Sequence, residues 1–408
     1  MERSERAGLV LRPFHGVRFA VDDPAAVTSP PYDLISPEEL EELLACHPNN
    51  VVRLILPGAG HYGDAQAELR RWLDSGVLAV DGLPGLYVYE QTGVGFLQRG
   101  LIGAVQVGSE SVLPHEDVLP GPVADRLALM RATEANLEPI FLLYEGGGTA
   151  SRLVDDVATQ RFPLADVRTR DGVHHRLWEV TDPDEIAAVG EDLRDRQALI
   201  ADGHHRYATY QALRAGHVGS GPWDHGLAYL VDSTAYPPDL RAIHRVIPGL
   251  PLEEAAARAK GSWQVHEFAS LEDALVGLAT ASGPAFVLAG DGPSHLLTEP
   301  DRLQVEHAMP AGRSARWKAL DTSVLSMFLL PKVWGIADSE ESVLVVHHDP
   351  LAAVRLASRV HGTAVLLNPL STDDVLAVAA QGERVPRKST SFGPKPRTGL
   401  VMRTFASD

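Results

Sequence analysis

The sequence predicts a mixed protein of the α/β (α+β) class. Apolar, strand-like runs alternate with amphipathic helix patterns along most of its 408 residues. Hydrophobic residues make up 45% of the chain and charged residues 22%, as is ordinary for a globular protein in water. We find no internal repeat and no low-complexity tract. Strands and helices at this spacing pack as layers, and the length allows more than one domain.

The N-terminal half predicts helices and strands in turn. Ser36 and Glu39 form a capping-box pattern around Pro37, so we expect a helix to begin there. The apolar run VVRLILP, residues 51–57, predicts a strand, and GDAQAELRRWLDSG predicts a helix. Further strands are expected at GLYVYEQ, LIGAVQVG, PIFLLYEG and VHHRLWEV, and further helices at PVADRLALMRAT and PDEIAAVGEDLRDR.

The character of the sequence changes after residue 250, where shorter elements predict a smaller α/β module. The runs PLEEAAARAKGSW, SLEDALVGLATAS, PAFVLAG and HLLTEP begin it, and SVLVVHHDP, LAAVRLASRVHG and TAVLLNP continue it. We therefore divide the chain into a first α/β region (1–250), a second α/β module (251–380) and a basic C-terminal segment (381–408) that folds back on the core.

A formal net charge of −18 limits the partners of the chain. Most of such a surface repels polyanions, so we expect a small anionic ligand and no nucleic acid. No apolar run approaches the length that spans a bilayer, and the N-terminal stretch lacks the apolar core of a signal peptide. We expect a cytoplasmic protein without a membrane partner, and its oligomeric state stays open. The single cysteine, Cys46, excludes an internal disulfide and a cysteine-based zinc cluster.

The stretch ALIADGHHRYATYQALRAG predicts a strand that turns abruptly into a helix. Residues 198–201 have the character of a buried strand. Tyr207, Tyr210 and Leu213 then recur at helical spacing, and Gly216 is placed to end the helix.

Five residues form the turn between them: Asp202, Gly203, His204, His205 and Arg206. Gly203 lets the backbone approach a ligand, and a helix N-terminus attracts anions through its free N–H groups. Arg206 adds a fork of donors suited to phosphate. We interpret the turn as a phosphate-binding site. In the alternative interpretation, Asp202 only caps the helix and the histidines pack against neighbouring loops.

A second candidate group follows the strand-like run that ends before Pro114. His115 and Glu116 are expected on a loop near a strand end. A carboxylate in that position can accept the proton of an attacking hydroxyl, which is the one proton-transfer role that phosphoryl transfer needs. In the alternative interpretation, both are solvated loop residues.

The third group is the C-terminal stretch RVPRKSTSFGPKPRTGLVMRTF, residues 384–405. Its basic residues, with hydroxyls between them and Pro and Gly turns, can hold phosphate oxygens. We therefore expect Lys388 and Lys395 to fold back towards the same cleft as the Asp202–Arg206 turn and to bind phosphate, with Ser389 and Thr390 near the rim of that cleft. The run GLVMRTF predicts a terminal strand, so the segment is expected to be ordered. We also expect a truncation after Val385 to weaken nucleotide binding without unfolding the N-terminal half.

These motifs closely resemble a bacterial and archaeal family known as domain of unknown function 1015. The resemblance runs from residue 13 to about residue 405. It is carried by the runs PFHGVRF, SPPYDLISPEEL, NVVRLILP, LPHEDVLPGPVADRLALMRATEANLEPIFLLY, IADGHHRYATY, HHDP and VPRKSTSFGPKPRTGLV. Two of these motifs, Pro114-His115-Glu116 and Asp202–Arg206, also resemble motifs of free serine kinases with the ParB/sulfiredoxin-like fold.

That resemblance implies a ParB/sulfiredoxin-like core carrying the turn, and a small-molecule kinase activity. Glu116, with His115, would act as base on a hydroxyl such as that of free serine, and the turn would hold the phosphates of ADP or ATP. Tyr32, Asp33 and Arg126, which lie in the matched motifs, are expected to contact the substrate.

Mg²⁺ is expected with the nucleotide, with Asp202 and Glu116 as candidate contacts. Here 85 residues separate Glu116 from Asp202, whereas the serine kinases place the two motifs close together. Sulfiredoxin chemistry is excluded because the turn holds no cysteine.

Two other functions are compatible with parts of the sequence. A non-catalytic, nucleotide-binding regulator of the ParB-like class fits the same motifs, although the net charge argues against binding to DNA. A metal hydrolase is suggested by the 17 histidines, among them the pairs His174-His175, His204-His205 and His347-His348. None of these pairs has the i, i+4 spacing of helical zinc sites, and neighbours on a strand point to opposite faces.

Overall fold

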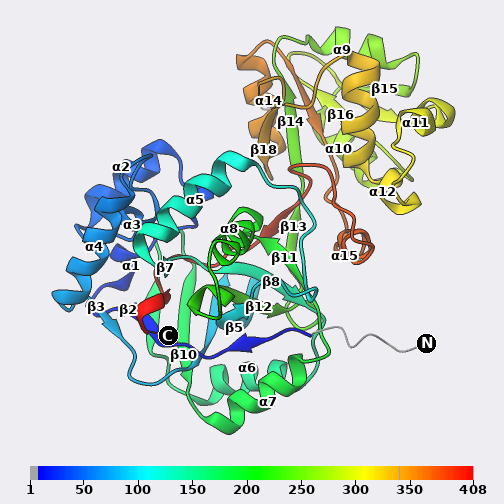
Figure 1. Cartoon of the computed structure of the whole chain (residues 1–408). Coiled ribbons are helices and arrows are strands. Elements are labelled where there is room, and N and C mark those ends of the chain that lie inside the picture. Colours follow the sequence, from blue (N-terminus) through cyan, green and yellow to red (C-terminus); the bar gives the residue numbers. More distant parts are fainter. Residues whose placement is uncertain (1–7, 340, 408) are drawn as a thin grey trace, which may run out of the picture. The chain divides into compact units, whose positions relative to one another are not determined.

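The structure, a computed structural model, describes residues 8–339 and 341–407 and has the expected mixed α/β class. These residues form two compact units (Figure 1). Unit 1 holds residues 8–114, 118–238 and 394–407, and unit 2 holds residues 115–117 and 239–393. The basic C-terminal segment is therefore divided between the units, with the boundary between Gly393 and Pro394.

Unit 1 is built on a nine-stranded sheet with the order β6-β11-β8-β12-β5-β4-β10-β9, beside which β1 pairs with β5. Strands β4 and β5, both expected as strands, form an antiparallel hairpin, whereas β12 pairs parallel with β8. The strands of this sheet are β1 (Leu11–Arg12), β4 (Leu86–Gly93), β5 (Phe96–Gln106), β6 (Val112–Leu113), β8 (Ile140–Tyr144), β9 (Ala165–Arg168), β10 (His174–Val180), β11 (Ala198–Asp202) and β12 (His225–Asp232).

A four-stranded sheet with the order β3-β2-β21-β7 completes the strands of unit 1. These are β2 (Gly16–Phe19), β3 (Leu78–Val80), β7 (Ala135–Asn136) and β21 (Met402–Thr404). The helices of unit 1 are α1 (Pro24–Val27), α2 (Pro37–Cys46), α3 (Val52–Ile55), α4 (Tyr62–Asp74), α5 (Pro120–Thr133), α6 (Thr149–Gln160), α7 (Pro183–Leu193) and α8 (His204–Ala215), with short 3-10 turns η1 (Tyr32–Leu34), η2 (Pro222–Asp224) and η4 (Phe405–Ser407).

Alternate residues of the nine-stranded sheet make one large apolar core with α6, α7 and α8. Val88, Leu142 and Leu230 belong to this cluster, together with Val154 of α6 and Tyr210 of α8. Strand residues one position away point to the opposite face of the sheet. The core therefore fixes α8, and with it the turn that precedes α8, against the sheet.

Unit 2 contains a six-stranded sheet, β15-β17-β16-β19-β14-β18, and a two-stranded one, β13-β20. The strands are β13 (Asp239–Arg241), β14 (Ile243–Ile247), β15 (Gln264–Phe268), β16 (Phe286–Ala289), β17 (Ser294–Thr298), β18 (Leu344–His347), β19 (Thr363–Leu366) and β20 (Ser391–Gly393). The helices are α9 (Leu252–Ala259), α10 (Leu271–Thr280), α11 (Arg302–Ala308), α12 (Ala315–Ala319), α13 (Asp321–Val324), α14 (Pro350–Arg359) and α15 (Thr372–Ala380), with a π-helical segment η3 (Leu325–Trp334).

The strand expected at residues 51–57 is wrong, because Val52–Ile55 form the short helix α3. Asn50 explains the difference. Its side-chain oxygen accepts a hydrogen bond from the Val52 N–H at 3.1 Å, and this local bond starts a helical turn. Val52, Leu54 and Ile55 are all fully buried, so the run has no polar face from which its period can be read.

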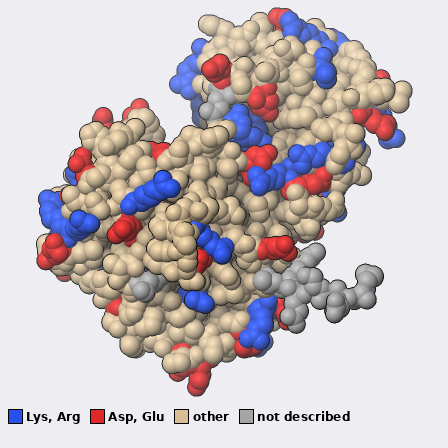
Figure 2. Space-filling model, in the orientation of Figure 1, with Lys and Arg blue, Asp and Glu red and all other residues tan. Residues whose placement is uncertain are grey.

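Charges of both signs are interspersed on the face of the molecule drawn in Figure 2. Along the described ranges, no helix is both long and apolar enough to cross a membrane.

Candidate functional site

The turn from Asp202 to Arg206 joins β11 directly to α8, as the sequence predicts. The pairing of β11 with β8 shifts register between Ile200 and Asp202, and Asp202 is its last paired residue, opposite Phe141. Gly203 then adopts a left-handed conformation with φ +93° and becomes the N-cap of α8. A Cβ atom at Gly203 would lie 3.0 Å from Cγ2 of Ile140, so both backbone angle and space favour glycine here.

Arg206 is buried beneath this turn, with 5% of its surface exposed. Its guanidinium donates hydrogen bonds to Oδ2 of Asp202 and to the carbonyl of Pro139, both at 2.5 Å. Burial alone would lower the pKa of Arg206, but the carboxylates of Asp202 and Glu138 outweigh it and raise the pKa. Asp202 precedes Gly203, which is the N-cap residue of α8.

Lys395 of the C-terminal segment contacts the same turn. Its Nζ lies 2.6 Å from Oδ1 of Asp202 and 2.7 Å from Oδ2 of Asp33. Burial would lower the pKa of Lys395, but the two carboxylates raise it. Arg397, two residues further on, anchors the segment by donating to Oγ1 of Thr28 at 2.7 Å.

The three residues predicted to contact the substrate lie beside this group. The Tyr32 N–H donates to Oε1 of Glu138 at 3.0 Å, and the Arg126 guanidinium lies 4.5 Å from the centre of the Tyr32 ring. Burial raises the pKa of Tyr32 to about 12. A water-sized cavity of about 30 Å³ is lined by the polar side chains of Arg126, Glu138, Arg206 and Tyr210, among others.

His205 contacts a neighbouring loop. The N–H of Leu119 donates to Nε2 of His205 at 3.1 Å, so this ring nitrogen accepts a hydrogen bond. One part of the alternative interpretation of the turn, the packing of this histidine against a loop, therefore agrees with the structure.

The second group of predicted residues lies in unit 2, around Glu116. Oε1 of Glu116 accepts hydrogen bonds from the Thr390 hydroxyl at 2.8 Å and from the Thr390 N–H at 3.2 Å. Nε2 of His115 lies 2.8 Å from the same Thr390 hydroxyl oxygen. Because the hydroxyl proton points to Glu116, the histidine is the donor in that contact. His115, Thr390 and Glu116 thus form a short hydrogen-bonded chain.

Burial raises the pKa of Glu116 above its ordinary value, although its bonds from Thr390 and the charge of Lys388 pull the other way. Such a carboxylate takes up a proton more readily than an exposed one. This is the property that a general base needs near neutral pH.

Buried Arg245 holds the loop that carries Thr390. Its guanidinium donates to the carbonyl of Lys388 at 2.8 Å and to that of Arg387 at 3.2 Å. Lys388 has a positive φ of 56°, which is uncommon for a residue with a side chain. The Ser389 hydroxyl donates to the carbonyl of Pro386 at 2.5 Å, which closes the turn. Arg245 therefore sets the position from which the next residue reaches Glu116.

The structure thus brings the predicted residues together in two groups. Asp33, Asp202, Arg206 and Lys395, with Tyr32 and Arg126 beside them, form the group in unit 1. The group in unit 2 contains His115, Glu116, Lys388, Ser389 and Thr390. The convergence of both groups on one phosphoryl group stays a prediction. Within the described residues, no cluster of three or more His, Cys, Asp or Glu side chains could hold a metal ion by itself.

Sequence reasoning missed Glu138 and Arg245, which organise the two groups. Glu138 accepts from both Tyr32 and the Thr398 hydroxyl, yet it stands in the sequence as one glutamate before a proline. Arg245 lies inside a strand, where a basic residue is usually predicted to face solvent. No local signal distinguishes either residue, because their partners are distant in the chain.

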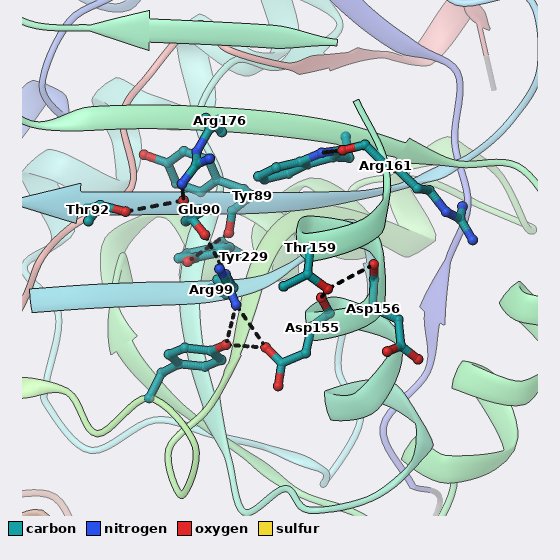
Figure 3. Close-up of polar contacts among 12 residues, drawn as sticks. Tyr89, Glu90, Thr92, Arg99, Asp155, Asp156, Thr159, Arg161, Arg176 and Tyr229 are labelled. Atoms are coloured by element: carbon teal, nitrogen blue, oxygen red, sulfur yellow. Dashed lines mark hydrogen bonds and ion pairs between the residues drawn. The ribbon is translucent and has the colours of Figure 1, made fainter. Parts of the chain in front are cut away.

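A further buried ion cluster in unit 1 has no counterpart in the sequence predictions. Figure 3 shows Glu90 of β4 between the guanidinium groups of Arg99 and Arg176, with Arg99 also 3.2 Å from Asp155 of α6. Glu90 is completely buried and makes ion pairs with both arginines, which offsets the cost of its burial. We interpret the cluster as structural, since it joins three strands and a helix.

Together these features define a mixed α/β protein of two compact units, each of which holds one group of the predicted site residues. The chain belongs to the family described as "Protein of unknown function (DUF1015)", whose model matches residues 11–323. No curated protein matches the sequence.

Several solved structures are distantly similar. A free serine kinase variant in complex with AMP has a TM-score of 0.37 at 14% identity, covering 71% of this chain and 89% of its own. SbnI from Staphylococcus aureus, with a C-terminal truncation, has a TM-score of 0.38 at 14% identity, covering 73% and 85%. A conserved hypothetical protein from Pyrococcus furiosus has a TM-score of 0.37 at 14% identity, covering 72% and 90%.

Proposed function

We propose that the protein is a phosphotransferase that moves a phosphoryl group from ADP or ATP to the hydroxyl of a small molecule such as free serine. The observation that carries the proposal is the hydroxyl already bonded to Glu116, that of Thr390 at 2.8 Å. A general base must reach the proton that it removes, and this contact has the distance that such a transfer needs. The Pro-His-Glu and Asp-Gly-His-His-Arg motifs support the same activity through their resemblance to free serine kinases.

In the proposed reaction, the substrate hydroxyl oxygen attacks the terminal phosphorus of the nucleotide. The new P–O bond forms as the bond to the leaving AMP or ADP breaks, and Glu116 takes the hydroxyl proton. Positioning and charge neutralisation supply most of the catalysis in this class of reaction. His115 would hold the hydroxyl oxygen through its Nε2–H, as it does with Thr390.

The turn in unit 1 is proposed to hold the nucleotide phosphates. The N-terminus of α8 presents backbone N–H groups, and its N-cap is a glycine, which has no side chain of its own. Lys395 and Arg206 would add charge-assisted hydrogen bonds. Tyr32 and Arg126 would line the substrate end.

Mg²⁺ fits the oxygen donors of this group. Asp33 and Asp202 already share one cation, the Lys395 ammonium. Hard carboxylate oxygens with phosphates and water are the ligands that Mg²⁺ prefers, and it needs few protein ligands. Asp202, with Asp33 beside it, would therefore hold the ion, which would neutralise phosphate charge.

A screen of nucleotides against hydroxylated amino acids tests the proposal. The full chain is incubated with ADP, ATP or CTP, Mg²⁺ and each amino acid, and phosphorylated products are detected by mass spectrometry. We expect one nucleotide to support formation of a phosphorylated amino acid. Nucleotide binding without any product would favour the non-catalytic regulator instead, and absence of both would overturn the proposal.

A further inference from the structure

The hydroxyl that lies on Glu116 belongs to the chain itself. Thr390 is bonded to Glu116 at 2.8 Å and to His115 at 2.8 Å, which are the two residues proposed to act on the substrate hydroxyl. We propose that Thr390 is itself a phosphoryl acceptor, so that the protein phosphorylates its own 390 position. This inference rests on the proposed function and adds to it a modification site and a form of regulation.

The Ser389 hydroxyl differs from that of Thr390 in its exposure and in its hydrogen-bond acceptor. Ser389 is 3% exposed, and its hydroxyl donates to the Pro386 carbonyl, which cannot remove a proton. Thr390 is only partly buried, and its hydroxyl donates to a carboxylate. The adjacent Ser389 is therefore an internal control for selectivity.

The geometry leaves the Thr390 oxygen able to react. A hydroxyl oxygen has two lone pairs, and the contact with Nε2 of His115 uses one of them. The second lone pair attacks the terminal phosphorus of ATP or ADP. The Oγ–P bond forms, the bond from phosphorus to the leaving ADP or AMP breaks, and the hydroxyl proton passes to Glu116.

Phosphorylation at this position would change the surroundings of Glu116. A phosphothreonine carries about −1.5 to −2 charges at neutral pH, directly beside a carboxylate. It would repel Glu116 and exclude a second phosphoryl acceptor from the base. We therefore expect the modified protein to transfer phosphoryl groups to small hydroxyls at least tenfold more slowly than the unmodified protein.

The test uses the full chain with γ-³²P-labelled ATP or β-³²P-labelled ADP and Mg²⁺, without a small acceptor. We expect the chain to become labelled, and peptide mass spectrometry to place the phosphate on Thr390 and not on Ser389. Thr390→Val should remove the label, whereas Thr390→Ser, which keeps a hydroxyl, should retain it. Circular dichroism shows whether each variant is folded, and the wild-type phosphopeptide decides the matter even if Thr390→Val does not fold.

Glu116→Gln should lower labelling at least a hundredfold, whereas Asp117→Asn, which changes the adjacent exposed carboxylate, should not. The remaining outcomes separate this inference from the proposed function. A phosphorylated small acceptor without phosphate on Thr390 overturns this inference and leaves the proposed function standing. Phosphate on another residue also overturns the inference, and transfer to neither kind of acceptor overturns both.

Discussion

Three cationic and four acidic side chains meet around the turn of unit 1. Arg206 pairs with Asp202, and Lys395 pairs with Asp202 and Asp33. Arg126 pairs with Asp125, and Glu138 lies near Arg206. The buried charges are therefore satisfied without a ligand, as buried ions must be. A polyphosphate would have to exchange some of these pairs for its own oxygens, helped by the N–H groups of α8 and by Mg²⁺.

Lys395 is the residue at which such an exchange is most direct. A charge-assisted phosphate contact is worth about 1.5–3 kcal/mol. We expect Lys395→Met to weaken ADP or ATP binding about ten- to a hundredfold, as measured by isothermal titration calorimetry. Lys332→Met, at an exposed position of unit 2, is the matched control and should leave the affinity unchanged. Equal affinities in all three proteins would show that Lys395 is a structural ion-pair partner only.

His175 is expected to make the stability of the fold depend on pH. Burial lowers its pKa to about 3, and Tyr89 Oη lies 2.8 Å from its Nδ1. An unfolded histidine has a pKa of about 6.5, so below this pH the unfolded chain binds a proton that the folded chain does not. The stabilisation is therefore present above pH 6.5 and is lost as the pH falls towards 3.

Urea unfolding at several pH values measures this loss. Between pH 6.5 and pH 5 we expect the free energy of unfolding to fall by about 2 kcal/mol more in the wild type than in His175→Gln. Parallel pH profiles for the two proteins would mean that His175 titrates normally in the folded state.

At the scale of single elements, helix starts and turns that depend on residues adjacent in the sequence were predictable. The capping box of α2 is present, with Ser36 and Glu39 bonded to each other's backbone, and the strand-to-helix turn at Asp202 is confirmed. The helix α3 was not predictable, because its start depends on buried Asn50, which also donates to the Ala26 carbonyl at 2.8 Å. The bond to Val52 is local, but the Asn50 side chain that makes it is also held by Ala26, which is distant in the sequence.

A substitution of Gly203 tests whether the left-handed conformation of the turn contributes to stability. Its φ of +93° is disfavoured for any residue with a Cβ, and the added atom would press on Ile140. We expect Gly203→Ala to lower the free energy of unfolding by about 1–3 kcal/mol, measured by urea denaturation. Gly216→Ala is the matched control at the other end of α8, where φ is −82°, and it should change stability much less. Equal effects would show that the left-handed turn is not required.

At the scale of the whole molecule, the C-terminal segment takes part in both units. Strand β20 pairs with β13 in unit 2, and β21 lies between β2 and β7 in the four-stranded sheet of unit 1. Arg403 of β21 is completely buried and donates to Asn136 Oδ1 at 2.9 Å. The expectation that truncation after Val385 spares the N-terminal half therefore does not fit the structure, because that truncation removes an interior strand.

Deletion of residues 394–408 should therefore destabilise unit 1. Removal of β21 exposes apolar partners such as Val17 and leaves Asn136 without its cationic partner. Since whole domains are stable by only about 5–15 kcal/mol, we expect loss of the cooperative unfolding transition followed by circular dichroism in urea. An unchanged transition midpoint would show that the remaining strands suffice.

The candidate site was likewise predictable where it depends on residues adjacent in the sequence and not where it depends on long-range contacts. The turn, Glu116 and the basic segment were identified because each is a compact run of chemically suitable residues. Two contacts were not predicted. Lys395 contacts Asp33, which is more than 350 positions away in the sequence, and Arg245 donates to the carbonyl of Lys388. These contacts depend on which strands become neighbours, and no short pattern encodes that.

The central claim, that Glu116 is the base of a nucleotide-dependent phosphoryl transfer, is tested most directly by one paired measurement. Phosphoryl transfer from labelled nucleotide and nucleotide affinity are determined for the wild type, Glu116→Gln and the control Asp117→Asn. We predict that Glu116→Gln loses about 10²–10⁴-fold in turnover while its nucleotide dissociation constant stays within about twofold of the wild-type value, and that Asp117→Asn behaves as wild type. Undiminished turnover in Glu116→Gln would contradict the claim.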